Sequence, residues 1–93
     1  MFKNITKLEE VEILEKVNNL IKAADDIYTG SLKVKLSDER LAKLLRYSVR
    51  AGEDMKRVKL HVTDMYIQSQ IDRCIRNMGY LKDHLIKQIA NNQ

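Results

Sequence analysis

The fold depends on residues 37–93, which read SDERLAKLLRYSVRAGEDMKRVKLHVTDMYIQSQIDRCIRNMGYLKDHLIKQIANNQ. This stretch has no proline and only two glycines, Gly52 and Gly79, while its apolar residues recur every three or four positions. One continuous helix of this length would reach about 80 Å. A compact domain of this size has a radius of gyration of only ~12 Å. The stretch therefore either folds back on itself or extends beyond its own subunit and needs a partner.

Two heptad series with different phases run through this stretch. The first has the spacing of a coiled-coil seam and comprises Leu44, Ser48, Ala51, Met55, Val58, Val62, Met65 and Ser69. The second comprises Ile67, Ile71, Cys74, Met78, Leu81 and Leu85, and is displaced by two residues. That displacement moves the buried face by about 200° around the helix. A turn near residues 66–70, where Ser69 and Asp72 match a capping pattern, would explain it, as would an unbroken rod. The missing turn residues favour the rod or a mild kink.

The N-terminal third predicts a separate amphipathic helix. Thr6 and Glu9 form a capping box, so a helix is expected over about residues 7–29, with Gly30 closing it in a left-handed conformation. A sector about 140° wide contains its apolar residues. These are Ile13, Leu14, Val17, Leu20, Ile21, Ala24, Ile27 and Tyr28.

The second helical segment has its own start signal. Ser37 is a good N-cap, so a long helix or two helices are expected over about residues 38–91, after an ordered loop at 30–37. Gly52 lies inside this segment and indicates either a close backbone approach or a kink. The whole chain is thus expected to be one all-α domain, residues 1–93. It would be a helical hairpin or a three-helix bundle with a long, straight or kinked C-terminal arm.

A first helix of about 22 residues would cover only part of so long an arm. The uncovered apolar seam therefore predicts a homo-oligomer. The expected interface residues are Met55, Val58, Val62, Met65, Ile71, Met78, Leu81 and Leu85.

The composition describes a small domain of 93 residues, 44% hydrophobic and 32% charged. No run approaches the ~20 apolar residues of a membrane span, and the charged N-terminus lacks a signal sequence. A single cysteine, Cys74, cannot form an intrachain disulfide. We therefore expect a cytoplasmic protein without a membrane partner. The abundance of Lys, Ile and Asn is typical of AT-rich genomes, including those of many bacteria and phages.

A basic ridge is the most distinctive polar feature. Lys43, Arg46, Arg50, Arg57 and His61 fall within a sector about 60° wide, roughly opposite the seam. Tyr47 adds an aromatic ring beside them. Residues 31–61 carry nine basic and four acidic side chains. The ridge is a candidate site for an anion or an acidic partner. The alternative is a solvated face in which Glu53 and Asp54 pair with Arg50 and Arg57.

Catalytic and metal-binding patterns are not found in the sequence. His61 and His84 lie far apart, and no Cys/His cluster has metal-ligand spacing. Cys74 falls on the apolar seam, which is typical of a small core residue rather than a nucleophile. No glycine-rich phosphate loop occurs. We therefore expect no enzyme, no catalytic residue, no metal and no cofactor.

The expected function is a non-enzymatic, homo-oligomeric interaction module that regulates, inhibits or scaffolds a protein partner. One alternative is nucleic-acid binding through the basic ridge. Another is a small anionic ligand such as a nucleotide, held at a subunit interface near Arg46, Tyr47 and Arg50. Small helical chains of this kind recur among phage regulators and inhibitors of host enzymes, but this is an analogy of shape only.

Overall fold

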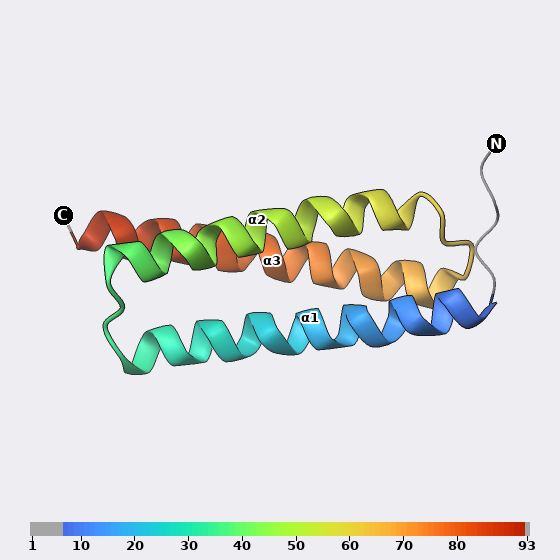
Figure 1. Cartoon of the computed structure of the whole chain (residues 1–93), viewed down its shortest axis with the longest axis horizontal. Coiled ribbons are helices and arrows are strands. Elements are labelled where there is room, and N and C mark those ends of the chain that lie inside the picture. The colour runs from blue at the N-terminus through green and yellow to red at the C-terminus, as the bar shows by residue number, and fades with distance from the viewer. Residues whose placement is uncertain (1–6, 93) are drawn as a thin grey trace.

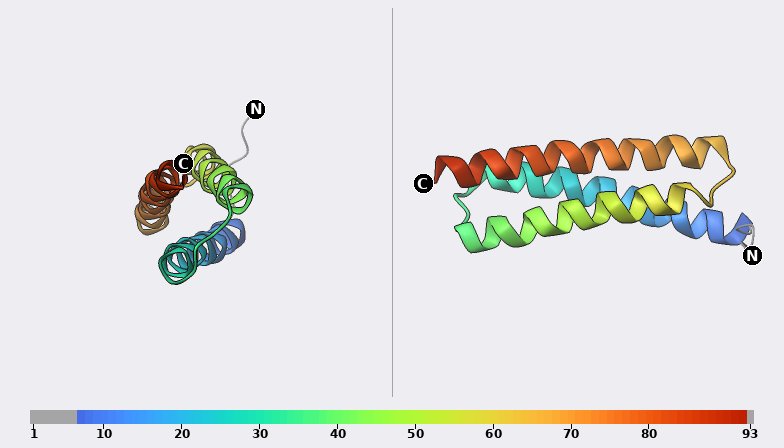
Figure 2. Two further views of the ribbon diagram at one scale, coloured as in Figure 1. Left: turned by 90° about the vertical axis from the view of Figure 1, so that its left-hand side faces the viewer. Right: turned by 90° about the horizontal axis from the view of Figure 1, so that it is seen from above.

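The chain forms a three-helix bundle. The computed structural model describes residues 7–92, of which none is in a strand. Helix α1 spans Lys7–Lys33, α2 spans Asp38–Lys59 and α3 spans Met65–Asn91. Figure 1 shows α1 and α3 running in the same direction, with α2 antiparallel to both. Viewed end-on in Figure 2, the helices lie at the corners of a triangle. The prediction of an all-α fold is confirmed.

The C-terminal arm is two helices rather than a rod, and the turn lies at residues 60–64 instead of 66–70. The amides of Leu60, His61 and Val62 bond to carbonyls three residues earlier, at 3.2, 3.0 and 3.3 Å. Asp64 then caps α3, and its Oδ1 accepts a hydrogen bond from the amide of Ile67 at 3.0 Å. These bonds satisfy backbone groups at the helix ends without proline or glycine. The capping pattern at residues 69–72 lies inside α3 and caps nothing.

The two heptad series meet inside one chain because of this turn. All six members of the second series are buried, and Ser48, Ala51, Met55 and Val62 of the first series are buried with them. Helix α3 packs closely on α2 and also on α1. Each series therefore finds its neighbours within the same bundle.

The residues expected at an oligomer interface belong largely to this core. Met55, Val62, Ile71, Met78, Leu81 and Leu85 are buried within a single chain, and Val58 is half-buried against the core. Only Met65, which is 83% exposed, remains open to a partner. The apolar seam therefore does not require a second copy. The premise for the oligomer was an uncovered rod, and the turn at 60–64 removes it.

Helix α1 begins at Lys7, close to the predicted start, but continues to Lys33 instead of ending near residue 29. Gly30 lies inside the helix, and among the described residues no glycine has a positive φ. The predicted cap Thr6 lies outside the described residues. The loop is consequently shorter than predicted, at 34–37. Gly52 lies in an uninterrupted α2, where an added Cβ would meet the Cβ of Met78 at an ordinary 3.8 Å.

Polar contacts fasten α1 at both ends. Near its start, the carboxylate of Glu10, only 8% exposed, accepts a hydrogen bond from Oγ1 of Thr63 at 3.1 Å. Near its end, Oγ of Ser31 donates to the carbonyl of Tyr28 and lies 2.7 Å from Nε2 of His84. Because the Ser31 proton is already used, Nε2 of His84 is the donor in this second contact. The rings of Tyr28 and His84 also pack, with centroids 4.6 Å apart.

Cys74 lies fully buried in α3, which confirms the prediction of a core position. Burial disfavours the charged thiolate and raises the pKa of the Cys74 thiol from 9.0 to about 11. A thiol with this pKa stays protonated near neutral pH, so its contribution is packing rather than nucleophilic chemistry.

We predict that Asp64→Ala lowers the free energy of unfolding by about 1 kcal/mol, because the first turn of α3 loses its capping acceptor. Asp64→Asn should retain most of the stability. Urea denaturation of the three proteins provides the measurement. Ser69→Ala is the matched control at the rejected capping position and should leave stability almost unchanged. A larger loss for Ser69→Ala than for Asp64→Ala would contradict the position of the turn.

We also predict that the native thiol of Cys74 reacts at pH 8 about 100-fold or more slowly than an unfolded thiol, since its pKa is two units higher. Denaturant should abolish the protection. The folded state retains the proton above pH 9, where the unfolded thiol releases it, so this group lowers stability as the pH rises from about 9 to about 11. Thiol-reagent kinetics with and without urea test the prediction. Rapid labelling of the native protein would contradict it.

Candidate functional site

A groove runs along the boundary between α1 and α2, which contact each other much less than either contacts α3. Its central hollow has a volume of about 460 Å³ and shares lining residues with a hollow of about 360 Å³ at one end, while a third hollow of about 410 Å³ lies further along the same two helices in the other direction. The three together are called the α1–α2 groove. The central hollow is lined by Lys16, Leu20, Lys43, Arg46, Tyr47, Arg50, Ala51, Asp54 and Met55.

Apolar side chains from both helices form the floor of the groove. Helix α1 contributes Ile13, Leu20 and Ile27, which recur every seven residues and so lie along one line of the helix. Helix α2 contributes Met55 and Val58 toward one end, and Leu44 toward the other. An aliphatic strip therefore follows the full length of the boundary.

Basic side chains line the edges of this strip. Six basic residues line the α1–α2 groove against two acidic ones, a balance of +4. The whole chain has the same formal charge of +4, so the charges elsewhere cancel. The net charge of the protein is thus concentrated on one face. The basic residues are Lys16, Arg40, Lys43, Arg46, Arg50 and Arg57, and the acidic residues are Asp26 and Asp54.

Two of these cations have acidic neighbours on their own helix. Nζ of Lys43 lies 3.8 Å from Oε1 of Glu39, and Arg57 contacts Oδ1 of Asp54 at 3.3 Å. Both pairs are largely exposed to solvent, where an ion pair contributes little to stability. Each carboxylate nevertheless offsets the charge of the cation beside it.

Arg46 and Arg50 have no ion pair or hydrogen bond with any residue in 7–92. The pairing of Arg50 with Glu53 or Asp54 that the helical spacing suggests is not formed, since Glu53 contacts Lys56 at 3.6 Å and Asp54 contacts Arg57. Two guanidinium groups at the centre of the groove therefore keep their hydrogen-bond donors available. A guanidinium is suited to binding a carboxylate through two donors at once.

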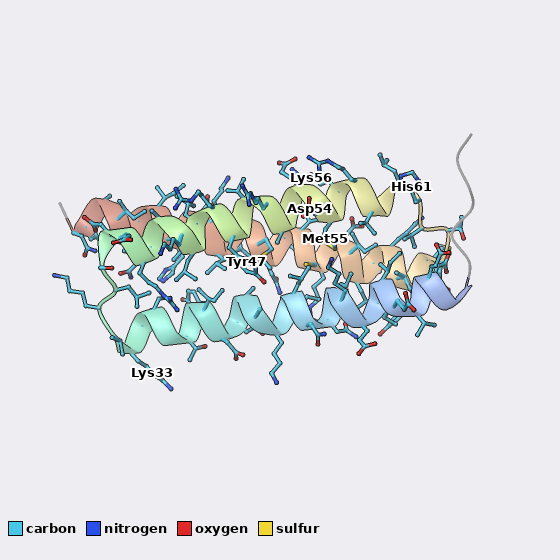
Figure 3. All side chains as sticks on the ribbon, viewed as in Figure 1. Lys33, Tyr47, Asp54, Met55, Lys56 and His61 are labelled. Atoms are coloured by element: carbon cyan, nitrogen blue, oxygen red, sulfur yellow. The ribbon has the colours of Figure 1, made fainter. Side chains whose placement is uncertain are left out.

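Tyr47 places an aromatic ring between the basic edge and the apolar floor. Figure 3 shows Tyr47 and Met55 on the side of α2 that faces α1, with Lys56 and His61 on the opposite side. Tyr47 is 38% exposed, whereas Met55 is buried. Burial, and secondarily the Cys74 thiol, raise the pKa of Tyr47, so its hydroxyl remains a protonated donor.

The structure brings together four of the six residues predicted for anion or acidic-partner binding. Lys43, Arg46, Tyr47 and Arg50 line the central hollow, and Arg57 lines an end hollow. The sixth, His61, points away from α1. The basic ridge does not lie opposite the apolar residues, because Ala51 and Met55 line the same hollow.

Sequence reasoning missed the contribution of α1 to this site. Leu20 belongs to the apolar sector expected for the first helix and Lys16 lies just outside that sector, but nothing in their spacing indicates which face of α2 they meet. That information depends on how both helices pack on α3.

Other kinds of site find little support in residues 7–92. No group of three or more His, Cys, Asp or Glu residues there could hold a metal ion, and none of the described helices is long and apolar enough to cross a membrane. Comparison with known protein families, curated proteins and solved structures finds no match to this chain. The α1–α2 groove is therefore the basis for the function proposed below.

We predict that Arg46→Gln raises the free energy of unfolding by about 0.2–0.5 kcal/mol, because it removes a like-charge pair with Arg50 at i,i+4. The gain should shrink in high salt, which screens the same repulsion. Thermal and urea denaturation at two salt concentrations provide the measurement.

Lys22→Gln is the matched control for this change. Lys22 lies on an exposed part of α1, one turn before Asp25 and Asp26, so its loss should leave stability unchanged or slightly lower. A destabilised Arg46→Gln protein at low salt would contradict the idea that the rim cations repel one another.

Proposed function

We propose that this protein is a non-enzymatic interaction module that binds a partner protein in the α1–α2 groove and thereby regulates, inhibits or scaffolds that partner. The observation that carries the proposal is a long face of the bundle that combines an aliphatic floor with unpaired arginines. Contiguous apolar surface of this kind, edged by polar groups, is typical of protein-binding sites. A core of this size has little stability to spare, so an uncovered face is a feature that function would explain.

The chemistry of the groove supports binding rather than catalysis. The protonated, buried Cys74 is unsuited to attack a substrate, and His61 points away from α1. The lining of the groove includes no histidine and no pair of carboxylates arranged as an acid and a base. Ser31 at one end does lie 2.7 Å from Nε2 of His84, but its hydroxyl donates to the Tyr28 carbonyl, so the histidine does not accept the serine proton. The polar groups of the groove are mainly fixed cations that can hold an anion but do not exchange protons near neutral pH.

The proposal does not depend on a homo-oligomer, because the expected interface residues are already used in the core. Nucleic-acid binding is the second candidate, and the unpaired Arg46 and Arg50 are the observation in its favour. The aliphatic floor counts against nucleic-acid binding. Bases stack on aromatic rings, and Tyr47 is the only aromatic residue that lines the central hollow.

Site-specific photocrosslinking tests the proposal. We predict that a photoreactive amino acid in place of Tyr47, in cells that express the protein, captures a discrete protein partner, because position 47 faces the groove. The same amino acid in place of Tyr66, an exposed tyrosine on α3, is the matched control and should not capture it. Capture should be lost in an Arg46→Glu/Arg50→Glu background. No protein adduct from position 47, or equal adducts from positions 47 and 66, would contradict the proposal.

A further inference from the structure

We propose that the occupant of the α1–α2 groove is an acidic amphipathic helix of a different protein, which lies lengthwise between α1 and α2 and completes a four-helix bundle. This inference rests on the proposed function and names the chemical class of the partner. It is argued from the shape of the groove, its charge and its floor.

The shape fits an elongated occupant. The central hollow and one end hollow share Lys16, Asp54 and Met55, and the consecutive residues Lys43 and Leu44 line the central hollow and the other end hollow. From Ile13 to Ser31 the α1 wall is about 27 Å long, or about five helical turns. The heptad spacing of Ile13, Leu20 and Ile27 suits a helix that packs nearly parallel to α1.

The charge of the groove specifies an acidic partner. Its lining has a balance of +4, with Lys16 on one wall facing the cluster of Lys43, Arg46 and Arg50 on the other. Five of the six cations belong to α2, and α1 adds only Lys16, so an occupant with carboxylates along its flank toward α2 would meet cations along the whole groove. Complementary charge of this kind directs partner choice and speeds association. Like-charged helices would be rejected by the same walls.

A second copy of this chain does not fit the groove. Groove-to-groove pairing would bring two faces of +4 together, which is repulsive. The exposed apolar residues Tyr66, Tyr80 and Ile86 of α3 occur on a helix that is not acidic overall, because its exposed charges are Asp72, Arg73, Arg76, Asp83 and Lys87. In the acidic part of α1, residues 9–26, Val11 is the one large apolar side chain that is exposed. Beyond Asp25 and Asp26, Tyr28 and Leu32 are exposed as well, but this part of α1 extends over only about two helical turns, much less than the length of the groove.

The floor favours a protein helix over nucleic acid. Met55 and Ala51 are already buried, but Ile13, Leu20, Ile27 and Leu44 are only half-buried and can be covered by the aliphatic side chains of a partner. A phosphate backbone would contact the rim and leave this floor exposed. An amphipathic helix has apolar residues for the floor and charged residues for the rim, so it uses both features.

Binding of designed peptides to the full chain tests the inference. The first peptide is a helix of about 20 residues with one apolar stripe flanked by glutamates, and the second is identical except that lysines replace the glutamates. Fluorescence anisotropy should show the glutamate peptide binding at least about 10-fold more tightly, with an affinity that falls as salt rises. Fluorescent duplex DNA and single-stranded RNA are measured in parallel and should bind more weakly than the glutamate peptide.

Charge-reversal variants test whether the peptide binds in the groove. Arg46→Glu/Arg50→Glu should weaken the glutamate peptide at least about 10-fold and improve binding of the lysine peptide. Arg73→Glu/Arg76→Glu is the matched control, since it makes the same change in net charge on exposed α3 positions outside the groove, and it should change affinity less than about twofold. Circular dichroism confirms folding of each variant. Lys16→Glu provides an independent reversal on the α1 wall if the double variant does not fold.

Four results would overturn the inference: no binding of either peptide, equal binding of the two peptides, equal effects of the two charge reversals, or tighter binding of a nucleic acid. A fifth is a photocrosslink from position 47 to a second copy of this chain, which would overturn the inference in favour of that copy as the occupant. These failures are distinguishable from failure of the proposed function. If position 47 still captures a protein in cells while the glutamate peptide does not bind, the function stands and the acidic helix is wrong. If position 47 captures nothing, the function itself is wrong.

Discussion

The rest of the structure depends on the apolar seam of α3, which packs against two helices at once. The six residues of the second heptad series, from Ile67 to Leu85, are buried on this one helix, which packs against both α2 and α1. Each of those helices must bury a face of its own, and both do so against α3 rather than against each other. The third possible contact of the triangle is therefore incomplete. The α1–α2 groove follows directly from that division.

Electrostatics explains why the open face does not close. Bringing α1 and α2 together would press Lys16 against the cluster of Lys43, Arg46 and Arg50 and would strip water from all four charges. The apolar floor alone favours closure, and the rim opposes it. A bundle whose only requirement was stability would place aliphatic residues at these positions. Local features that lower stability without an evident structural return are characteristic of functional sites.

Much of this architecture could be predicted from the sequence, because it depends on local signals. Ser37 caps α2 as expected, and its hydroxyl oxygen accepts a hydrogen bond from the amide of Arg40 at 3.2 Å. The second heptad series and the core position of Cys74 are also confirmed. The turn was placed too late because it contains neither proline nor glycine. The Asp64 cap was the available signal, since aspartate after a threonine and before an apolar run is a favourable N-cap.

The candidate site required information that no local pattern contains. The phase change between the two heptad series predicts two different neighbours, whereas the turn at 60–64 lets the two series pack chiefly against each other, with α1 adding a second neighbour for α3. The basic ridge could likewise be found on α2, whereas its apolar floor depends on Leu20 and Lys16 arriving from α1. Side-chain spacing describes one helix at a time. A groove between two helices depends on how those helices pack together.

The two polar contacts near the ends of α1 affect how the α1–α2 groove could evolve. Glu10 accepts a hydrogen bond from Thr63 near one end of α1, and Ser31 is hydrogen-bonded to His84 near the other. Both ends of α1 are therefore fixed to the rest of the bundle. Neither Glu10 nor His84 lines the groove. A change at either position would alter how α1 is held and so the distance between the walls, while every residue that lines the groove stays the same. The width of the groove can therefore change through mutations remote from its lining, without any change in its charge.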